Sequence, residues 1–416
     1  MFRPNLFRSL TAMCLVLTSY RYVHAQHPNG YWQMPGIHVP QSQPQSSPPI
    51  VDYYGGQRPK LWDNQQPVEQ FMGELAKRSW IRVDYLHWTL GRPGSMPIGA
   101  PLLNITDPLV VFDNMAGTPA GEAIIPSTGN LALDDSSGIR GTWGLDLASA
   151  DLELEFFGTE QNSDGFSLTN LSTGRATGAE TIGTTALPNV VTPLLSSGGV
   201  ADAAGANYLI YDSSFETNIK SQIWGAEATL LSKPYLPGEG LAWQWLGGFR
   251  YVAYEEEFRN RGVNNSGGLG TDVVTTFGGE TLNNMYGPEV GARLSAVHRW
   301  FTFSATPRIA FALNDYTAEA QSAPLGTTEV RYSGSDIEFT PIVQISFTGE
   351  IHITPNFSVF GGYDFMWIYR MTRPYDNIVY DSAAGLAGGF VPDIRQEVDL
   401  ESFYARGLSV GCVLRY

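Results

Sequence analysis

The chain is 416 residues long, which allows two or three ordinary domains or one large β architecture. Its formal net charge of −16 argues against nucleic acid as a partner, because binding phosphate requires a basic surface. Charged residues make up only 16% of the chain, below the roughly 25% of soluble domains, while 12% of the residues are aromatic. This composition is unusual for a soluble enzyme and fits alternating strands that face two different environments.

The first 25 residues have the pattern of an export signal. Arg3 and Arg8 supply a positive start, an apolar run extends from Leu10 to Leu17, and "VHA" before Gln26 is a small-residue cleavage pattern. We therefore predict a signal peptide over 1–25, with an apolar core too short to span a bilayer. The alternative is a lipidated Cys14, although the preceding "TAM" fits a lipoprotein site poorly.

After cleavage the chain would contain one cysteine, and its sequence would offer no candidate membrane helix. With Cys412 alone, neither an intramolecular disulfide nor a cysteine-rich zinc site can form. No later run of 18 or more apolar residues occurs, so an exported chain of this kind is either soluble or crosses a membrane as a barrel. Residues 26–78 are rich in Pro, Gln, Ser and Gly, and we predict a flexible linker there.

From Ser79 onward, apolar residues alternate with small or polar ones. In "SWIRVDYLHW" (79–88), Ile81, Val83 and Tyr85 fall on one face, opposite Arg82 and Asp84. A period of two recurs, more or less strictly, in nine further segments: 138–148, 151–158, 218–231, 241–254, 286–297, 300–313, 338–353, 356–369 and 407–416. Many of them reach the 9–11 residues that a tilted membrane-spanning strand needs.

The connections between these ten segments alternate in length. The long ones are 89–137, 161–214, 255–285, 314–337 and 370–402, and the short ones are 149–151, 232–240, 298–299 and 354–355. Ten antiparallel strands would place every short turn at one rim and every long loop at the other, as in outer-membrane barrels with short periplasmic turns and long external loops. We predict an all-β, antiparallel transmembrane β-barrel over 79–416. Hairpins within 89–137 or 161–214 could raise the strand number to twelve.

The C-terminal segment fits the last strand of such a barrel. Its apolar residues alternate and end on an aromatic ring: Leu408, Val410, Cys412, Leu414 and Tyr416. A barrel must pair its last strand with its first, because lipid offers no water to satisfy open backbone groups. We expect this stripe to close the barrel and to be the signal that the outer-membrane insertion machinery reads.

Several motifs resemble those of the planctomycete outer-membrane β-barrel proteins. They are "VDYLHW" in the first strand, "LGGFRYVAYEE" (246–256), "NNMYGPEVG" (283–291) and the ending "RGLSVGCVLRY", and the resemblance covers about 78–416. Members of that family usually end in Phe, where this chain has Tyr416. The resemblance implies an outer-membrane location and a barrel, and it implies no activity.

If the apolar positions face lipid, the alternate positions point into the barrel. They carry mixed charges, and we predict that these line the lumen: Arg82, Asp84, Arg140, Asp146, Glu153, Glu155, Arg250, Glu289, Arg308, Glu350 and Asp364. Paired charges would fill a narrow lumen, whereas unpaired ones would leave a small polar channel. Because barrels of about eight strands are filled by side chains, ten strands favour a blocked or very narrow lumen.

The sequence offers no catalytic constellation. Glu255, Glu256 and Glu257 follow a strand and predict a solvated cluster or a weak cation site rather than an acid–base pair. His87 lies near the external end of the first strand, close to Asp84, and is predicted to be an interface or lumen residue. HExxH does not occur, and the one GxSxG match, GLSVG at 407–411, lies inside the alternating C-terminal segment and not at the strand-to-helix turn that a catalytic serine requires. We assign no catalytic residue, no metal and no cofactor.

We therefore expect an outer-membrane barrel with a structural or surface-interaction role, with limited passage of small solutes as a further possibility. Its expected partners are outer-membrane lipid and the insertion machinery, and its oligomeric state is open. One alternative is an outer-membrane hydrolase with convergent Asp or Glu and His side chains in the external loops. A second alternative is a soluble, secreted all-β binding protein without a continuous apolar belt.

Overall fold

The computed structural model describes residues 73–100, 109–114, 118–169, 171, 189–195, 207–235, 240–265, 272–384 and 390–416. The predicted signal peptide and most of the predicted linker lie outside these ranges. Among the described residues, no helix is long and apolar enough to cross a membrane, which is a finding about helices alone.

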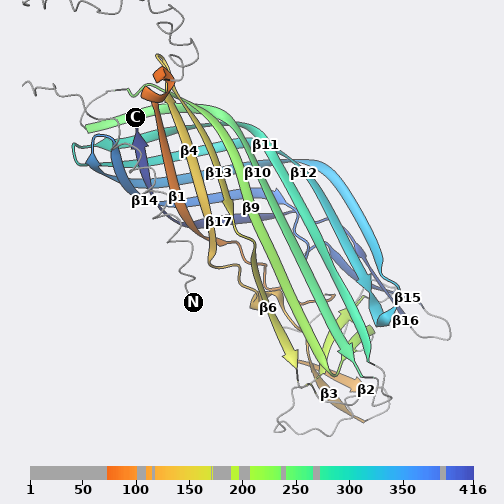
Figure 1. The fold of residues 1–416 in the computed structure, drawn as a ribbon. Coiled ribbons are helices and arrows are strands. Elements are labelled where there is room, and N and C mark those ends of the chain that lie inside the picture. Colours follow the sequence, from red (N-terminus) through yellow and green to blue (C-terminus); the bar gives the residue numbers. More distant parts are fainter. Residues whose placement is uncertain are drawn as a thin grey trace, which may run out of the picture. The chain divides into compact units, whose positions relative to one another are not determined.

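Ten antiparallel strands form a closed ring, as the sequence predicts (Figure 1). β17 pairs with β1, and β9 pairs with β10, so every strand of the ring has a neighbour on both sides. In ring order the strands are β1 (Ser79–Leu90), β4 (Ser136–Asp146), β5 (Ala150–Thr159), β9 (Ser214–Ser232), β10 (Gly240–Asn264), β11 (Val273–Val297), β12 (Phe301–Ala323), β13 (Val330–Thr354), β14 (Phe357–Met371) and β17 (Glu401–Arg415).

The C-terminal strand closes the ring against the first strand. Trp80 pairs with Arg415 and Leu90 with Ala405, in an uninterrupted antiparallel register. Following the register around the ring from Leu90 leads back to β1 at Arg78, which is a shear of 12 residues. Ten strands with this shear tilt by about 40° and enclose an interior that side chains can fill.

Alternation along the strands gives the barrel an apolar outer face. Phe249, Phe347 and Leu408 are each more than half exposed, whereas Arg250, Thr340 and Ser409, on the opposite parity, are buried. Aromatic residues lie toward both ends of this apolar belt: Tyr235, Trp243, Trp245, Trp300 and Tyr416 at the end with short turns, and Trp224, Tyr251, Trp367, Tyr369 and Tyr404 toward the other. Such girdles are typical of barrels that cross a membrane.

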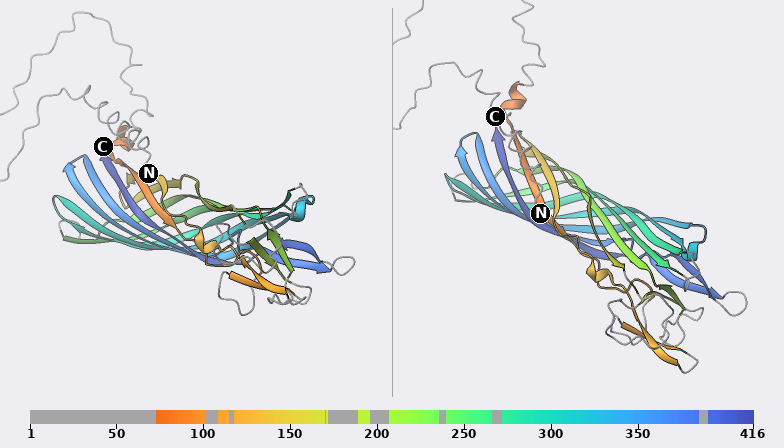
Figure 2. Two further views of the ribbon diagram at one scale, coloured as in Figure 1. Left: turned by 90° about the horizontal axis from the view of Figure 1, so that it is seen from below. Right: turned by 60° about the horizontal axis from the view of Figure 1, so that its bottom comes forward.

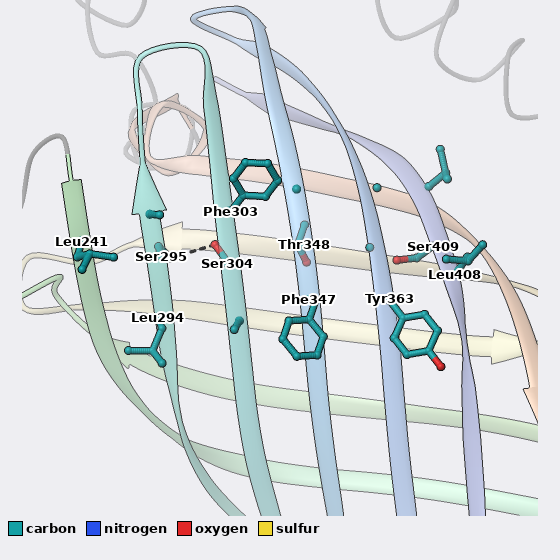
Figure 3. A pocket seen from close by; sticks show the side chains of 16 residues that line it. Leu241, Leu294, Ser295, Phe303, Ser304, Phe347, Thr348, Tyr363, Leu408 and Ser409 are labelled. Carbon is teal, nitrogen blue, oxygen red and sulfur yellow. Dashed lines mark hydrogen bonds between the residues drawn. The ribbon is translucent and has the colours of Figure 1, made fainter.

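A shallow hollow of about 710 Å³ lies on this outer face (Figure 3). Leu294, Phe303, Phe347 and Tyr363 surround it, and its floor includes Gly349 and Gly361. Most of its lining residues are apolar or glycine, and the surface that it presents is mainly apolar, so the hollow is part of the apolar belt.

Two of the predicted long loops are strands instead. β10 and β11 pair as far as Asn264 and Val273, and β12 and β13 as far as Ser322 and Val330. The connections therefore shrink to 265–272 and 324–329, and these hairpins project beyond the apolar belt (Figures 1 and 2). These strand extensions could not be recognised in the sequence, because their outward-facing residues are polar and the apolar alternation of the belt stops there. The backbone hydrogen-bond ladder between the strands nevertheless continues.

The other long connections contain strands that stay out of the ring, which therefore has ten strands and not twelve. β2 (Leu109–Asn114), β3 (Thr118–Ile124), β7 (Asn189–Leu194) and β8 (Asn207–Tyr211) form a separate sheet. β6 (Asn162–Thr169) pairs with β9 on the same side as β5, along the part of β9 that β5 does not reach. β15 (Ile378–Ala384) and β16 (Phe390–Gln396) pair with each other as a hairpin. Short 3₁₀ turns lie at Thr128–Asn130 (η1) and Pro324–Gly326 (η3). We call the end with the short turns the turn rim and the opposite end the loop rim.

Candidate functional site: the barrel interior

The interior has two chemically different halves. Toward the loop rim, inward side chains pack as an apolar core that includes Leu86, Trp88, Val252, Met366 and Phe403. Toward the turn rim, the inward side chains are charged or hydroxyl-bearing. The charged half contains most of the residues that the sequence assigns to the lumen.

One buried ion cluster is built around Arg140 of β4. Its Nη2 lies 2.7 Å from Asp84 Oδ2 and 3.1 Å from Asp364 Oδ2, and its Nε donates to Asp84 Oδ2 at 2.9 Å. Asp84 is on the neighbouring strand β1, but Asp364 is on β14, beyond β1 and β17. Arg140 is 5% exposed and both carboxylates are almost fully buried. The guanidinium therefore reaches across the interior.

A second cluster joins Arg250 and Arg308 to Glu227 and Glu289. Arg250 Nη2 is 2.6 Å from Glu227 Oε2 and its Nε is 3.0 Å from Glu289 Oε2. Arg308 of β12 pairs with Glu227 of β9, with two strands between them. Arg250 Nη1 also donates to Gln344 Oε1 at 2.6 Å, again past two intervening strands.

A third contact of the same kind lies nearer the turn rim. Arg293 of β11 donates to both oxygens of Glu153 of β5, at 2.8 and 2.7 Å, past β9 and β10. Neighbouring strands lie about 4.8 Å apart, so each such pair connects wall positions about 14 Å apart. We call Arg140, Arg250, Arg293 and Arg308 the crossing arginines. Together they divide the lumen at the level of the apolar belt.

A polar cavity of about 250 Å³ remains between the crossing arginines and the turn rim. Arg82, Glu155, Thr348, Glu350 and Arg415 are among its lining residues. Glu350 and Arg415 pair at 2.6 Å.

At the loop rim, residues 372–377 after β14 fold back into the ring. Arg373 donates to both oxygens of Glu256, at 2.8 and 2.6 Å, and to the carbonyl of Gly91 at 3.0 Å. Thr372 N–H donates to Asn283 Oδ1, whose Nδ2 donates in turn to the Thr372 carbonyl. Arg373 and Glu256 are each 1% exposed. This segment, which we call the loop-rim plug, closes the external half of the lumen.

The plug corrects the prediction for the three consecutive glutamates. Glu255 and Glu257 lie on the outer parity, but Glu256 is buried and paired with Arg373 instead of belonging to a solvated cluster. Strand alternation places Glu256 on the inner face, and the ion pair compensates its charge there. Nothing in the local sequence indicates Arg373 as the partner, because it follows Glu256 by 117 residues.

The predicted lumen residues lie as follows. Arg82, Asp84, Arg140, Glu153, Glu155, Arg250, Glu289, Arg308, Glu350 and Asp364 take the inward parity of their strands. Asp146 differs: it ends β4 at the turn rim, its side chain is 67% exposed, and it pairs with Lys233. Glu227 and Arg293 complete the network and are absent from the predicted set.

The described residues bring together no catalytic or metal-binding constellation. His87 Nε2 lies 3.4 Å from Asp135 Oδ1, but both side chains are on the outside, 42% and 83% exposed. Asp84, near His87 in sequence, points to the opposite face. No group of three or more His, Cys, Asp or Glu side chains in the described part of the chain is placed to hold a metal ion.

Comparison with known families identifies the fold. Residues 80–416 match the family described as "Putative beta barrel porin-7 (BBP7)". The chain belongs to this family. The match agrees with the closed ten-stranded ring and supports an outer-membrane location for this BBP7 barrel.

Solved structures add little detail for this BBP7 protein. A Pseudomonas aeruginosa FadL homologue is 7% identical over 81% of this chain and 90% of its own, with a TM-score of 0.24. The Pseudomonas putida toluene transporter TodX is 7% identical over 81% and 89%, with a TM-score of 0.20. Scores this low support no argument about solutes. No curated protein matches the sequence.

Proposed function

We propose that this BBP7 protein is an outer-membrane channel for small polar solutes that the structure captures in an occluded form. The observation that carries the proposal is the charged interior of a barrel with an apolar outer face. Ionisable side chains inside a membrane-spanning wall are costly, and they commonly mark an ion or solute pathway. Here they surround a polar cavity of about 250 Å³ at the periplasmic, turn-rim end.

The loop-rim plug is the element that would have to move for passage. It is held by Arg373 and Glu256 and by the exchange of hydrogen bonds between Thr372 and Asn283. The crossing arginines leave room only for small solutes, because three of them, Arg140, Arg293 and Arg308, line the cavity.

Planar-bilayer recordings test this proposal. We expect wild-type protein to give small or rare conductance steps. The double variant Glu256→Gln/Arg373→Gln removes both plug charges without leaving either one alone, and it should give more frequent or larger steps. The matched control is Arg395→Gln, which breaks the exposed pair with Asp381 on the β15–β16 hairpin and should behave as wild type. Silence from folded wild-type and double-variant protein would overturn the channel.

A surface-interaction role is the second candidate, and one observation favours it. Almost every side chain from Val330 to Ile337 on β13 is exposed, on both faces of the strand, beyond the apolar belt. Shortening the β12–β13 hairpin beyond Asp315 and Asp336 should then abolish binding of a surface partner while leaving conductance unchanged.

We include no catalysis in the proposed function. Among the described residues, the His87–Asp135 contact is the nearest approach to an acid–base pair at the loop rim. Both side chains are exposed, and neither lines the turn-rim cavity or the outer hollow.

A further inference from the structure

We propose that the turn-rim cavity binds a small zwitterion, with its carboxylate at Arg82 and its ammonium at Glu155. This inference rests on the proposed channel function and names the class of solute that the channel would hold. It follows from which of the charges around the cavity are already paired.

Most of the charged side chains that line the cavity have a partner of opposite sign. Arg293 pairs with Glu153, Arg415 with Glu350, Arg308 with Glu227, Arg140 with Asp84 and Asp364, and Asp151 with Lys233. Arg82 and Glu155 are paired least: Arg82 has one ion contact, the 3.4 Å approach of its Nε to Asp84 Oδ1, and Glu155 has none within 4.0 Å among the described residues.

Arg82 keeps most of its hydrogen-bonding capacity. Its Nε lies 3.4 Å from Asp84 Oδ1, beyond good hydrogen-bond distance, and its Cζ lies 3.7 Å from the centre of the Phe360 ring. Its Nη atoms form no hydrogen bond to any described residue, and 21% of the side chain is exposed to the cavity. Five N–H donors in a planar fork suit a carboxylate.

Glu155 has unused hydrogen-bond acceptors, whereas Arg82 has unused donors. It accepts one hydrogen bond from Thr142 Oγ1 at 3.2 Å, and within the described ranges no cation comes within 4.0 Å of it. Its carboxylate has lone pairs left for a donor such as an ammonium group.

The two residues flank a single position in the wall. Arg82 pairs with Thr142, and Thr142 pairs with Glu155, so the three lie in one row across β1, β4 and β5. Strands about 4.8 Å apart place the Cα atoms of Arg82 and Glu155 about 10 Å from each other. The two side chains form no ion pair with each other, because the one ion contact of Arg82 is with Asp84 and Glu155 has none. A solute with a carboxylate and an ammonium on the same carbon can engage both.

A singly charged solute fits this arrangement less well. An anion at Arg82 would leave Glu155 without a cation, and a cation at Glu155 would leave the Nη atoms of Arg82 without an acceptor; an uncompensated charge or donor away from bulk water is costly. A zwitterion pairs both groups at once. The cavity volume of about 250 Å³ has room for a solute of amino-acid size.

Equilibrium binding to detergent-solubilised protein tests the assignment, with glycine as the probe and acetate and methylammonium as its singly charged halves. We expect glycine to bind measurably more tightly than either half. Arg82→Gln and Glu155→Gln should each weaken glycine binding by about tenfold or more, the loss of one charge-assisted contact. The control, Arg331→Gln, removes a 63% exposed arginine far from the cavity and should change nothing.

Heat-modifiable gel migration would confirm that each variant is folded. Undetectable glycine binding, glycine binding no tighter than that of acetate, or unchanged binding in the folded variants would overturn the zwitterion site. Conductance recorded in parallel separates the two proposals: a conducting barrel that ignores glycine overturns only the zwitterion site, whereas glycine binding by a barrel that stays silent, plug variant included, overturns only the channel.

Discussion

Arg140 shows at the scale of one side chain why the lumen of this barrel is divided. Its guanidinium joins carboxylates on β1 and β14, and neither carboxylate has another cation closer than 3.4 Å. Removing the arginine would leave Asp364 buried with no cation within 4.0 Å among the described residues, and Asp84 with only the 3.4 Å contact to Arg82 Nε.

We expect Arg140→Met to lower the free energy of unfolding by about 3–5 kcal/mol, the usual cost of breaking a buried ion pair from one side. Urea titration of the barrel in lipid vesicles would measure it. Arg331→Gln, whose pair with Glu329 is exposed, should stay within about 0.5 kcal/mol of wild type. If Arg140→Met lowered the free energy of unfolding as little as Arg331→Gln, water and not Arg140 would be solvating the two carboxylates.

Asp376, within the loop-rim plug, makes the external end pH-dependent. Partial burial, with the nearby charges of Asp399 and Glu401, raises the pKa of its carboxyl to about 6. In the unfolded chain this pKa would be about 3.9. The folded state therefore binds the proton more tightly, and the local stability that Asp376 contributes is lost as the pH rises from about 4 to about 6.

Hydrogen exchange of residues 372–384 should accordingly be slower at pH 4.5 than at pH 6.5, after correction for the intrinsic rates. Asp376→Asn should remove most of this difference, because the amide stays neutral throughout. A wild-type pH dependence that persists in Asp376→Asn would assign the effect to other groups.

Sequence reasoning recovered the inward charges where alternation was strict, as for Arg82, Arg140 and Glu153. It missed Glu227 and Arg293, whose segments alternate less regularly. It could not find which charges pair, because each crossing contact joins strands with two others between them. The Arg82–Glu155 arrangement likewise depends on the register of three strands.

At the scale of elements, the closing strand β17 depends on glycines that let it approach β1. A Cβ on Gly411 would lie 2.2 Å from the Val83 carbonyl oxygen and 2.6 Å from Asp84 Cβ. A Cβ on Gly361, in the neighbouring strand β14, would meet only one atom, at 4.0 Å. The two positions form a matched pair for testing closure.

We expect Gly411→Ala to destabilise the barrel by about 1–3 kcal/mol, as overpacking does, and to lower the fraction that shows heat-modifiable migration. Gly361→Ala should leave both quantities near wild type. Equal behaviour of the two variants would show that β17 can shift to admit the methyl group, and that the close approach at Gly411 does not limit closure.

The strands themselves were predictable because both faces of the belt have a fixed chemistry. Outside the belt this constraint disappears. Glu255 and Asp315 take the outward positions where the belt has Phe249 and Phe311, so the pattern that marks a strand ends while the strand continues. Part of each of these two segments, which the sequence predicts to be long loops, is therefore strand.

At the scale of the whole barrel, the apolar belt and the projecting hairpins should respond differently to the same substitution. Phe347 and Ile337 both face outward on β13, 52% and 55% exposed. Phe347 lies amid the belt, with Ile351 and Ile353 on one side along the strand and Phe339 on the other. Ile337 is ten residues away, a rise of about 25 Å along the axis of a strand tilted by about 40°.

An arginine should therefore be costly at one position and tolerated at the other. We expect Phe347→Arg to reduce the free energy of unfolding in lipid vesicles by about 2–4 kcal/mol, and Ile337→Arg by about 0–1 kcal/mol, the depth dependence of a lipid-facing cation. In detergent the difference should narrow, because a micelle adapts around the charge. Equal costs in vesicles would contradict this placement of the membrane, and near-zero costs at both positions would favour a soluble barrel.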